Sequence, residues 1–355
     1  MTASPPARLL AAGTQAFAPK LQHQPALGPI DWQGAGFTPP QPLETPTKLP
    51  EADVVVIMWA DAEWAATHHV FCASGEPMSH GASDHGQFPG WQKDSADLIA
   101  GPMDWTYWGY FHLVQVGDTR VLVYKSNTHL DHPGEPALIA LTQRLASVVK
   151  PTAIISTGTA GGANATDHVG TVVIVNSATR YRHGEPPSDW ITYKSAWQPP
   201  AAPLSQASFS ELLMPIPITS PALNELATRL DEHEATHYTV QQFDPLGLNL
   251  PSQIPVIHNL SGGSTSLLTA STFLVGTTDD KFSAYACIEM DDAVIAAECQ
   301  KAGVHYGSVR NLSDPAQNPS LPSRAQGDWG STIYRGYGFY TSFNGALAAW
   351  AAVAT

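Results

Sequence analysis

Short runs of apolar, often β-branched, residues alternate along the chain with segments in which apolar residues recur at helical spacing. Asp53–Met58 is such a run, and its continuous apolar character is typical of a strand buried on both faces of a sheet. Gly117 and Asp118 separate two further runs, which indicates a hairpin. The runs predict strands at residues 53–58, 110–116, 119–124, 152–156, 170–175, 284–288 and 305–311.

The segments between these runs carry the helical pattern. In residues 135–149, for example, Leu138, Leu141 and Leu145 lie on one side of a helix. Because strands alternate with helices, the pattern predicts an α/β fold of three layers, in which helices cover both faces of a central mixed, largely parallel sheet. The predicted helices are residues 135–149, 220–233, 291–302 and 339–353.

Proline is concentrated in two stretches of the chain. Ten of the 30 prolines fall in residues 1–50, and eleven fall between His183 and Ile257. Proline has no backbone donor and disfavours helix interiors and central strands, so both stretches are predicted to be mostly irregular. The first is expected to be an arm, with Trp32 and Phe37 holding part of it against the body. The second is expected to be a packed lid or subunit contact.

Length and cysteine content are those of one large body. At about 100–200 residues per domain, the 355 residues suit one elaborated domain or two small ones. We predict an arm at 1–50 and a single domain at 51–355, with an insertion at about 183–257. A chain of this length buries enough apolar surface to be stable without a disulfide or a structural metal. Its three cysteines cannot form a disulfide framework.

The charge balance limits the partners of the protein. Its 17 Lys and Arg against 31 Asp and Glu give a formal charge of −14, which argues against binding to nucleic acid. No apolar run approaches the roughly 18 residues that a membrane span needs. Leu9–Ala12 is too short for the apolar part of a signal peptide, and Pro5 and Pro6 occupy its basic region. We therefore expect a cytoplasmic protein without a membrane contact.

Acids and glycines follow several of the predicted strands. Glu63 comes after the first strand, Gly158–Gly162 after the strand at 152–156, and Asp314 after the last one. A further acidic group, Glu289–Asp292, lies at a strand-to-helix junction. Each of these alone is explained by a helix N-terminus, a tight turn or a solvated face. Together they predict a site at one edge of the sheet, because ligands of α/β sheets bind at the carboxyl ends of strands.

Three of these segments resemble the nucleoside phosphorylase superfamily. Ile155–Gly162, which reads ISTGTAGG, resembles its central block, while Ile288–Asp291 and Val309–Ala316 resemble its VEMEA helix and its R-x-x-SD-x-A strand end. The resemblance is closest to the methylthioadenosine/S-adenosylhomocysteine nucleosidases and covers roughly residues 52–182 and 265–353. It implies the three-layer fold of that family, hydrolysis of a purine nucleoside to free base and sugar, no cofactor and a homodimer.

The resemblance also implies roles for individual residues. Asp314 matches the acid that donates a proton to the departing purine, and Glu63 matches the base that activates the attacking water. Glu289 and Asp291 match the acids around the ribose hydroxyls, although Asp291 is one methylene shorter than the usual Glu. The other implied substrate contacts are Met290 beneath the sugar, Phe273 and Leu274 at the base, Thr159, Ala160 and Gly161 in the anion- or water-binding turn, and Ser313.

Elementary chemistry is consistent with these roles. Cleavage of an N-glycosidic bond builds positive charge on the sugar and negative charge on the base, which a base-activated water and a carboxylic acid relieve. A phosphorylase of this superfamily binds phosphate through arginine. None of the nine arginines lies in the turn directly after the first strand. Asp61 and Glu63 lie there instead and would repel phosphate, so hydrolysis is predicted. The insertion follows Arg180 and Tyr181. The resemblance implies that elements on the 5′ side of the sugar lie near this position, so the insertion is predicted to select the 5′ substituent.

Three other interpretations remain open. The protein could be a phosphorylase that uses Arg180 or Arg182, or a non-catalytic nucleoside-binding or storage protein, although storage needs none of the predicted catalytic acids. A metal site is conceivable at His129, Asp131 and His132. These residues precede Pro133 in a loop and no Glu completes a zinc-protease motif, so we predict no metal.

Overall fold

The computed structural model describes residues 25–82, 86–98, 101–102, 105–164, 167–217, 255–271, 282–315 and 323–354, together with residues 224, 227, 228, 231, 239 and 274. Its strands are β1 (Gln41–Pro42), β2 (Val54–Met58), β3 (Gln92–Asp94), β4 (Gly109–Val116), β5 (Thr119–Ser126), β6 (Ala153–Gly162), β7 (Val172–Val175), β8 (Ser177–Arg180), β9 (Ile191–Lys194), β10 (Ile257–Asn259), β11 (Leu267–Thr269), β12 (Ile288–Glu289) and β13 (His305–Pro315). Its helices are α2 (Asp61–Cys72), α3 (Glu135–Arg144), α4 (Ala201–Ser205), α5 (Ala207–Leu212), α8 (Asp292–Ala302) and α9 (Ser323–Ala351).

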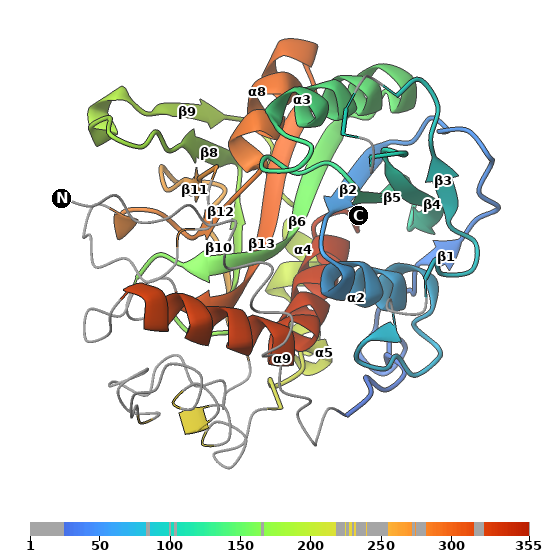
Figure 1. The fold of residues 1–355 in the computed structure, drawn as a ribbon. Helices are drawn as coiled ribbons and strands as arrows, with labels where there is room; N and C mark the ends of the chain where they lie inside the picture. The colour runs from blue at the N-terminus through green and yellow to red at the C-terminus, as the bar shows by residue number, and fades with distance from the viewer. Residues whose placement is uncertain are drawn as a thin grey trace.

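The strands form one mixed sheet whose centre is parallel (Figure 1). The order of the sheet is β1-β4-β5-β2-β6-β12-β11-β8-β9, and β13 pairs with β6 and β7. β2 runs parallel to β5 and β6, and β6 runs parallel to β13. The predicted hairpin is the antiparallel pair β4–β5. Because β2, β5, β6 and β13 share a direction, their carboxyl ends meet at one edge of the sheet.

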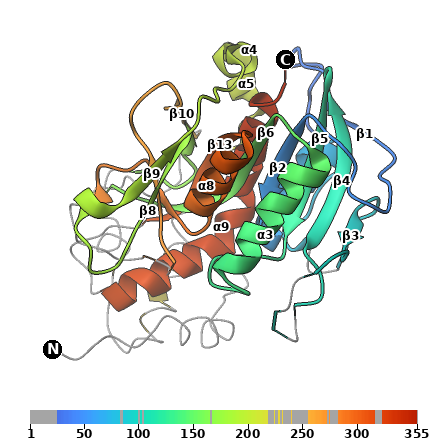
Figure 2. The ribbon, with the colours of Figure 1, turned by 90° about the horizontal axis from the view of Figure 1, so that it is seen from above.

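Helices cover both faces of this sheet, which confirms the predicted three-layer architecture. Figures 1 and 2 show α3 and α8 side by side on one face, with α9 on the opposite face. Alternate side chains of β2 pack to the two sides: Val55 and Ile57 belong to the core under α3 and α8, whereas Val56 and Met58 belong to the core with α2 and α9. None of the described helices is long and apolar enough to cross a bilayer.

The glycine-rich segment was predicted to be a turn, and this is wrong. β6 continues through it to Gly162, because β13 pairs alongside and provides hydrogen-bond partners up to the pair of Gly162 and Pro315. Gly158 has a φ of +154°, and a Cβ there would lie 2.7 Å from Oε1 of Glu63. At this position the glycine is therefore required by the close approach of a carboxylate to an extended strand.

Three other predictions of secondary structure need comment. The strand predicted at 284–288 is wrong except for Ile288, because Phe282 and Tyr285 turn to pack against Trp190. The closing helix begins at Ser323 rather than at residue 339, since several glycines obscure its apolar pattern. The helix predicted at 220–233 lies largely outside the described residues.

The described part of the proline-rich arm packs on the body, as its aromatic residues predicted. The ring of Trp32 lies 4.6 Å from that of Trp350 in α9, and Phe37 lies 5.1 Å from the same ring. The hydroxyl of Tyr340 donates to the carbonyl of Pro25 at 2.8 Å. Leu27, Trp32 and Phe37 of this segment thus pack into the core that contains α9.

Replacing Trp32 with Ala should lower the free energy of unfolding by about 3 kcal/mol, because it removes a large side chain that is only 4% exposed. Urea unfolding followed by circular dichroism measures this difference. Ile191→Ala, at a side chain that is 44% exposed, is the matched control and should change stability by less than about 0.5 kcal/mol. Equal stabilities for the Trp32→Ala variant and the unmodified chain would show that the arm is not part of the folded core.

Candidate active site

Glu63 is held in the first turn of α2, beside the carboxyl end of β2. Its Oε2 accepts hydrogen bonds from the backbone N–H groups of Trp59 at 2.9 Å and Ala60 at 2.8 Å. Its Oε1 accepts from the N–H of Thr159 at 2.7 Å and from the hydroxyl of the same residue at 2.8 Å. All four groups donate, so the buried carboxyl acts only as an acceptor, as an ionised carboxylate does. Glu63 and Thr159, both predicted from the sequence, are therefore in direct contact.

Asp314 lies at the carboxyl end of β13 in a different environment. It pairs in register with Gly161 of β6, just after an irregularity in the ladder, and is 3% exposed. Its Oδ1 accepts from the hydroxyl of Ser313 at 2.7 Å, whereas its Oδ2 has no hydrogen-bond partner among the described residues. Burial raises the pKa of this carboxyl, which the Ser313 hydrogen bond opposes. The arrangement favours a protonated acid that can donate from Oδ2.

Tyr334 of α9 lies near both carboxyls and was not predicted from the sequence. Burial and the charges of Glu63, Asp61 and Asp314 raise the pKa of its phenol. No pattern in the sequence pointed to this residue, because the amino-terminal half of α9 was not predicted to be helical.

The acids after β12 are buried rather than solvated. Asp292 is fully buried, and Arg310 of β13 donates to its Oδ1 at 2.7 Å. The same guanidinium donates to Oε2 of Glu289 at 3.3 Å and to the hydroxyl of Ser156 at 2.6 Å. Its Nη1 lies 3.4 Å from the carbonyl oxygen of Thr159, so this cluster adjoins the Glu63 site. Arg310 thus pairs with the side chains of both Glu289 and Asp292.

Both carboxyl oxygens of Glu289 accept hydrogen bonds from other groups of the protein. Oε2 accepts the backbone N–H groups of Asp291 at 2.6 Å and Asp292 at 3.0 Å, which closes the N-terminus of α8. The hydroxyl of Thr269 donates to Oε1. Burial and the neighbouring Asp292 raise the pKa of Glu289, and Arg310 opposes them. Oε1 accepts a single hydrogen bond from the described residues, so the ribose contact predicted for Glu289 stays a prediction.

Asp291 is paired with the loop that follows β5. Its Oδ1 accepts the N–H of Leu130 at 2.8 Å, and its Oδ2 lies 3.3 Å from Nε2 of His129. Nδ1 of that histidine lies 3.0 Å from Oδ1 of Asp131. Burial alone would lower the pKa of His129, but Asp291, Asp131 and Glu289 outweigh it and raise that pKa to about 9. Burial raises the pKa of Asp291 to about 6, although His129 opposes it.

His129 was considered at the sequence level only as a metal ligand. In the structure it instead pairs with two carboxylates. Among the described residues, no group of three or more His, Cys, Asp and Glu side chains is placed to hold a metal ion.

The remaining predicted contacts are less well defined. Ala160 and Gly161 lie in β6 beside β13, with Ser313 3.5 Å from the carbonyl oxygen of Ala160. Met290 is half-buried between Glu289 and Asp291. Leu274 is half-buried and packs against an aromatic cluster that contains Trp190 and Phe282, whereas Phe273 lies outside the described residues.

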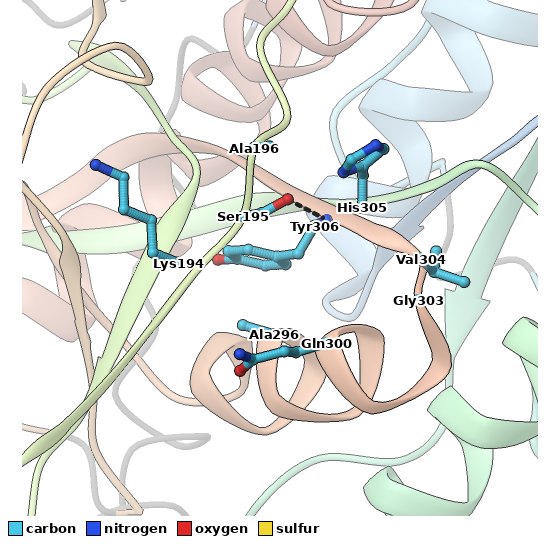
Figure 3. A pocket seen from close by; sticks show the side chains of 9 residues that line it. All are labelled: Lys194, Ser195, Ala196, Ala296, Gln300, Gly303, Val304, His305 and Tyr306. Carbon is cyan, nitrogen blue, oxygen red and sulfur yellow. Dashed lines mark hydrogen bonds between the residues drawn. The ribbon is translucent and has the colours of Figure 1, made fainter.

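A separate pocket of about 220 Å³ lies at the opposite end of β13 (Figure 3). Val304–Tyr306, at the amino end of that strand, line it together with parts of β9 and α8. In Figure 3 the hydroxyl of Ser195 accepts the backbone N–H of Tyr306, at 3.0 Å. None of the predicted site residues lines this pocket.

Gly158→Ala tests the close approach of β6 to Glu63. The added methyl group would meet the carboxylate at 2.7 Å, in a backbone conformation that favours glycine, so stability should fall by about 1–3 kcal/mol. We also expect any activity of the site to fall about tenfold or more, because Glu63 must move. Gly262→Ala, with nothing within 4 Å of the added Cβ, is the matched control. Thermal unfolding and activity equal to those of the control would contradict this account of Gly158.

The chain is similar in sequence to one known family and in structure to several solved proteins. A sequence model described as the phosphorylase superfamily matches residues 107–328. No curated protein sequence matches the chain. Similar solved structures include futalosine hydrolase of Helicobacter pylori strain 26695, with 12% identity, coverage of 85% of this chain and 98% of that one, and a TM-score of 0.43.

Two nucleosidases are similar to the same degree. The 5′-methylthioadenosine/S-adenosylhomocysteine nucleosidase from Neisseria meningitidis, solved with methylthio-immucillin-A, has 13% identity, coverage of 85% and 98%, and a TM-score of 0.44. The MTA/SAH nucleosidase of Streptococcus pneumoniae, in complex with 8-aminoadenine, has 14% identity, coverage of 85% and 100%, and a TM-score of 0.45.

Proposed function

Because the chain belongs to the phosphorylase superfamily, we propose that it hydrolyses the N-glycosidic bond of a purine nucleoside, releasing free base and sugar. Asp314 is the general acid that protonates the departing purine. Glu63 is the base that activates the attacking water, with Thr159 beside it. The cytoplasmic location and the homodimer remain predictions from the sequence.

The observation that carries this proposal is the contrast between two buried carboxyls at one edge of the sheet. Four donors surround Glu63, whereas one oxygen of Asp314 has no partner among the described residues and burial raises the pKa of that carboxyl. Pairs of carboxyls whose environments differ in this way serve as base and acid in glycoside hydrolysis. The arrangement therefore suits proton donation to a leaving group together with activation of water.

A water molecule can bind Glu63 only if one of the hydrogen bonds that this carboxyl accepts is broken. Each of its oxygens already accepts two hydrogen bonds, so an attacking water must replace one donor. The hydroxyl of Thr159 is the donor that can rotate away, whereas the three backbone N–H groups are fixed. We propose that water takes the place of this hydroxyl on Oε1 when the nucleoside binds.

The charges around the site favour water over phosphate as the nucleophile. The guanidinium of Arg310 reaches the site, but it pairs with Asp292 and Glu289. Arg180, which the phosphorylase interpretation would use, pairs with Glu135 at 2.9 Å. His129, a further cation at the site, is likewise paired with an acid, so a dianionic phosphate would meet several acids and little unpaired positive charge among the described residues.

Base release from a panel of nucleosides tests the proposed function. Purine and pyrimidine nucleosides, including 5′-thio and 5′-phosphorylated ones, are incubated with the protein in buffer free of phosphate, and free base is measured by chromatography. Purine release under these conditions is expected. Release that requires phosphate would identify a phosphorylase, and nucleoside binding without turnover would identify a binding or storage protein. Loss of release on addition of a chelator would show that a metal takes part.

A further inference from the structure

His129 is a histidine between two carboxylates at the candidate site. The loop that carries it follows β5, and it engages both oxygens of Asp291: Nε2 of His129 lies 3.3 Å from Oδ2, and the N–H of Leu130 donates to Oδ1 at 2.8 Å. Asp291 is 2% exposed, whereas the side chain of His129 is 33% exposed and faces solvent in part. The buried carboxylate of Asp291 is thus paired with the imidazolium of His129, which is partly exposed to solvent.

We propose that His129 is a positioning residue that keeps Asp291 ionised and fixes its orientation toward the sugar hydroxyls of the substrate. The inference rests on the proposed function, since it assigns the contact with the sugar to Asp291. Burying a carboxylate without a partner would favour its neutral form, which accepts hydrogen bonds from a hydroxyl less well. The two contacts from residues 129 and 130 remove the freedom of Asp291 to turn away.

The surrounding charges are consistent with this role. Asp131 from the same loop and Glu289 from the β12–α8 junction also face His129 and favour its charged form. His132 in turn faces Asp131, and favours the ionised form of that acid. Around Asp291 itself, Arg310 opposes the effect of burial on the pKa, and Asp292 adds to it.

The pair has a predictable dependence on pH. The carboxyl of Asp291, with a pKa of about 6, is ionised above that pH, so sugar recognition should strengthen as pH rises through about 6. The charge of His129 lowers the pKa of Asp291, so removing that charge must move this transition to higher pH. A purely structural role of His129 would not produce this shift.

The experiment compares His129→Gln and His129→Lys with the unmodified protein, on a ribonucleoside and its 2′-deoxy analogue, across the pH range. His129→Gln should lower kcat/KM for the ribonucleoside about tenfold or more and change that for the 2′-deoxy analogue much less. In the pH profile of kcat/KM for the ribonucleoside, the acid limb of His129→Gln should move to higher pH. In His129→Lys, which keeps the positive charge, the acid limb should return part of the way to its original pH. His305→Gln, at an exposed histidine near the opposite end of β13, is the control and should leave both unchanged.

The outcomes separate this inference from the proposed function. Equal losses on both substrates, or an acid limb that does not move, would overturn the role of His129 even if the unmodified protein releases base. If the unmodified protein releases no base, the proposed function fails, and the same variants are then compared by calorimetric binding of the two nucleosides. In that case a selective loss of ribonucleoside affinity in His129→Gln supports the inference, and an unchanged ratio of affinities overturns it.

Discussion

Replacing Asp314 with Asn is expected to lower kcat for purine release by about 10²–10⁴-fold while the protein stays folded. The amide cannot donate a proton to the departing base, which must then leave with its negative charge. Folding should be little affected, because Oδ2 of Asp314 has no partner among the described residues. The hydroxyl of Ser313, which donates to Oδ1, can donate to the amide oxygen of Asn instead. Stopped assays with chromatographic detection of the base measure the rate, and circular dichroism confirms folding.

A substrate with a good leaving group sharpens this test. The leaving group of a 4-nitrophenyl riboside is nitrophenolate, which departs without protonation. Asp314→Asn should therefore retain most of its activity on this substrate. Glu298→Gln is the matched control: Glu298 is a buried acid of α8, but it contacts Lys301 and Gln143 instead of the site. An unaffected rate of purine release in Asp314→Asn would remove this residue from the mechanism.

Glu63→Gln is expected to abolish hydrolysis to a similar extent, by about 10²–10⁴-fold, with a different substrate dependence. Glu63 acts on the water, so the variant should lose activity equally on the purine nucleoside and on the nitrophenyl riboside. Because the amide group of Gln can accept at only one end, at least one of the N–H donors from Trp59, Ala60 or Thr159 loses its partner. Stability should therefore also fall, by about 1–3 kcal/mol.

Asp61→Asn is the control for this variant. Asp61 lies two residues earlier in the same helical turn, and its side chain is 63% exposed. The control should keep both its stability and its activity. A Glu63→Gln variant that retains activity on either substrate would contradict the assignment of Glu63 as the base.

The sequence predicted the layers of the fold because each signal is local. Val55 and Val56 are adjacent, and their side chains pack into the cores on opposite faces of the sheet, which is why the strand reads as a continuous apolar run. Glu63 and Asp314 were predicted for a similar reason, since both lie close to the carboxyl ends of strands that share an edge of the sheet.

The features that the sequence did not predict depend on residues far apart in the chain. Gly158 was interpreted as part of a turn, because nothing local shows that β13 continues the ladder or that Glu63 lies against it. Leu130, next to His129 in the same loop, is separated from Asp291 by 161 positions in the sequence. No local motif therefore reveals that His129 and Asp291 pair. Such contacts follow from the topology of the sheet rather than from spacing.

Water, activated by Glu63, is the nucleophile in the proposed reaction. The most direct test is to identify the sugar product by mass spectrometry after turnover of a purine nucleoside in a large excess of inorganic phosphate. We expect free sugar, formed at the same rate with and without phosphate, and formed about 10²–10⁴-fold more slowly by Glu63→Gln and by Asp314→Asn. A sugar 1-phosphate as the product, or a rate that rises in proportion to phosphate, would contradict it.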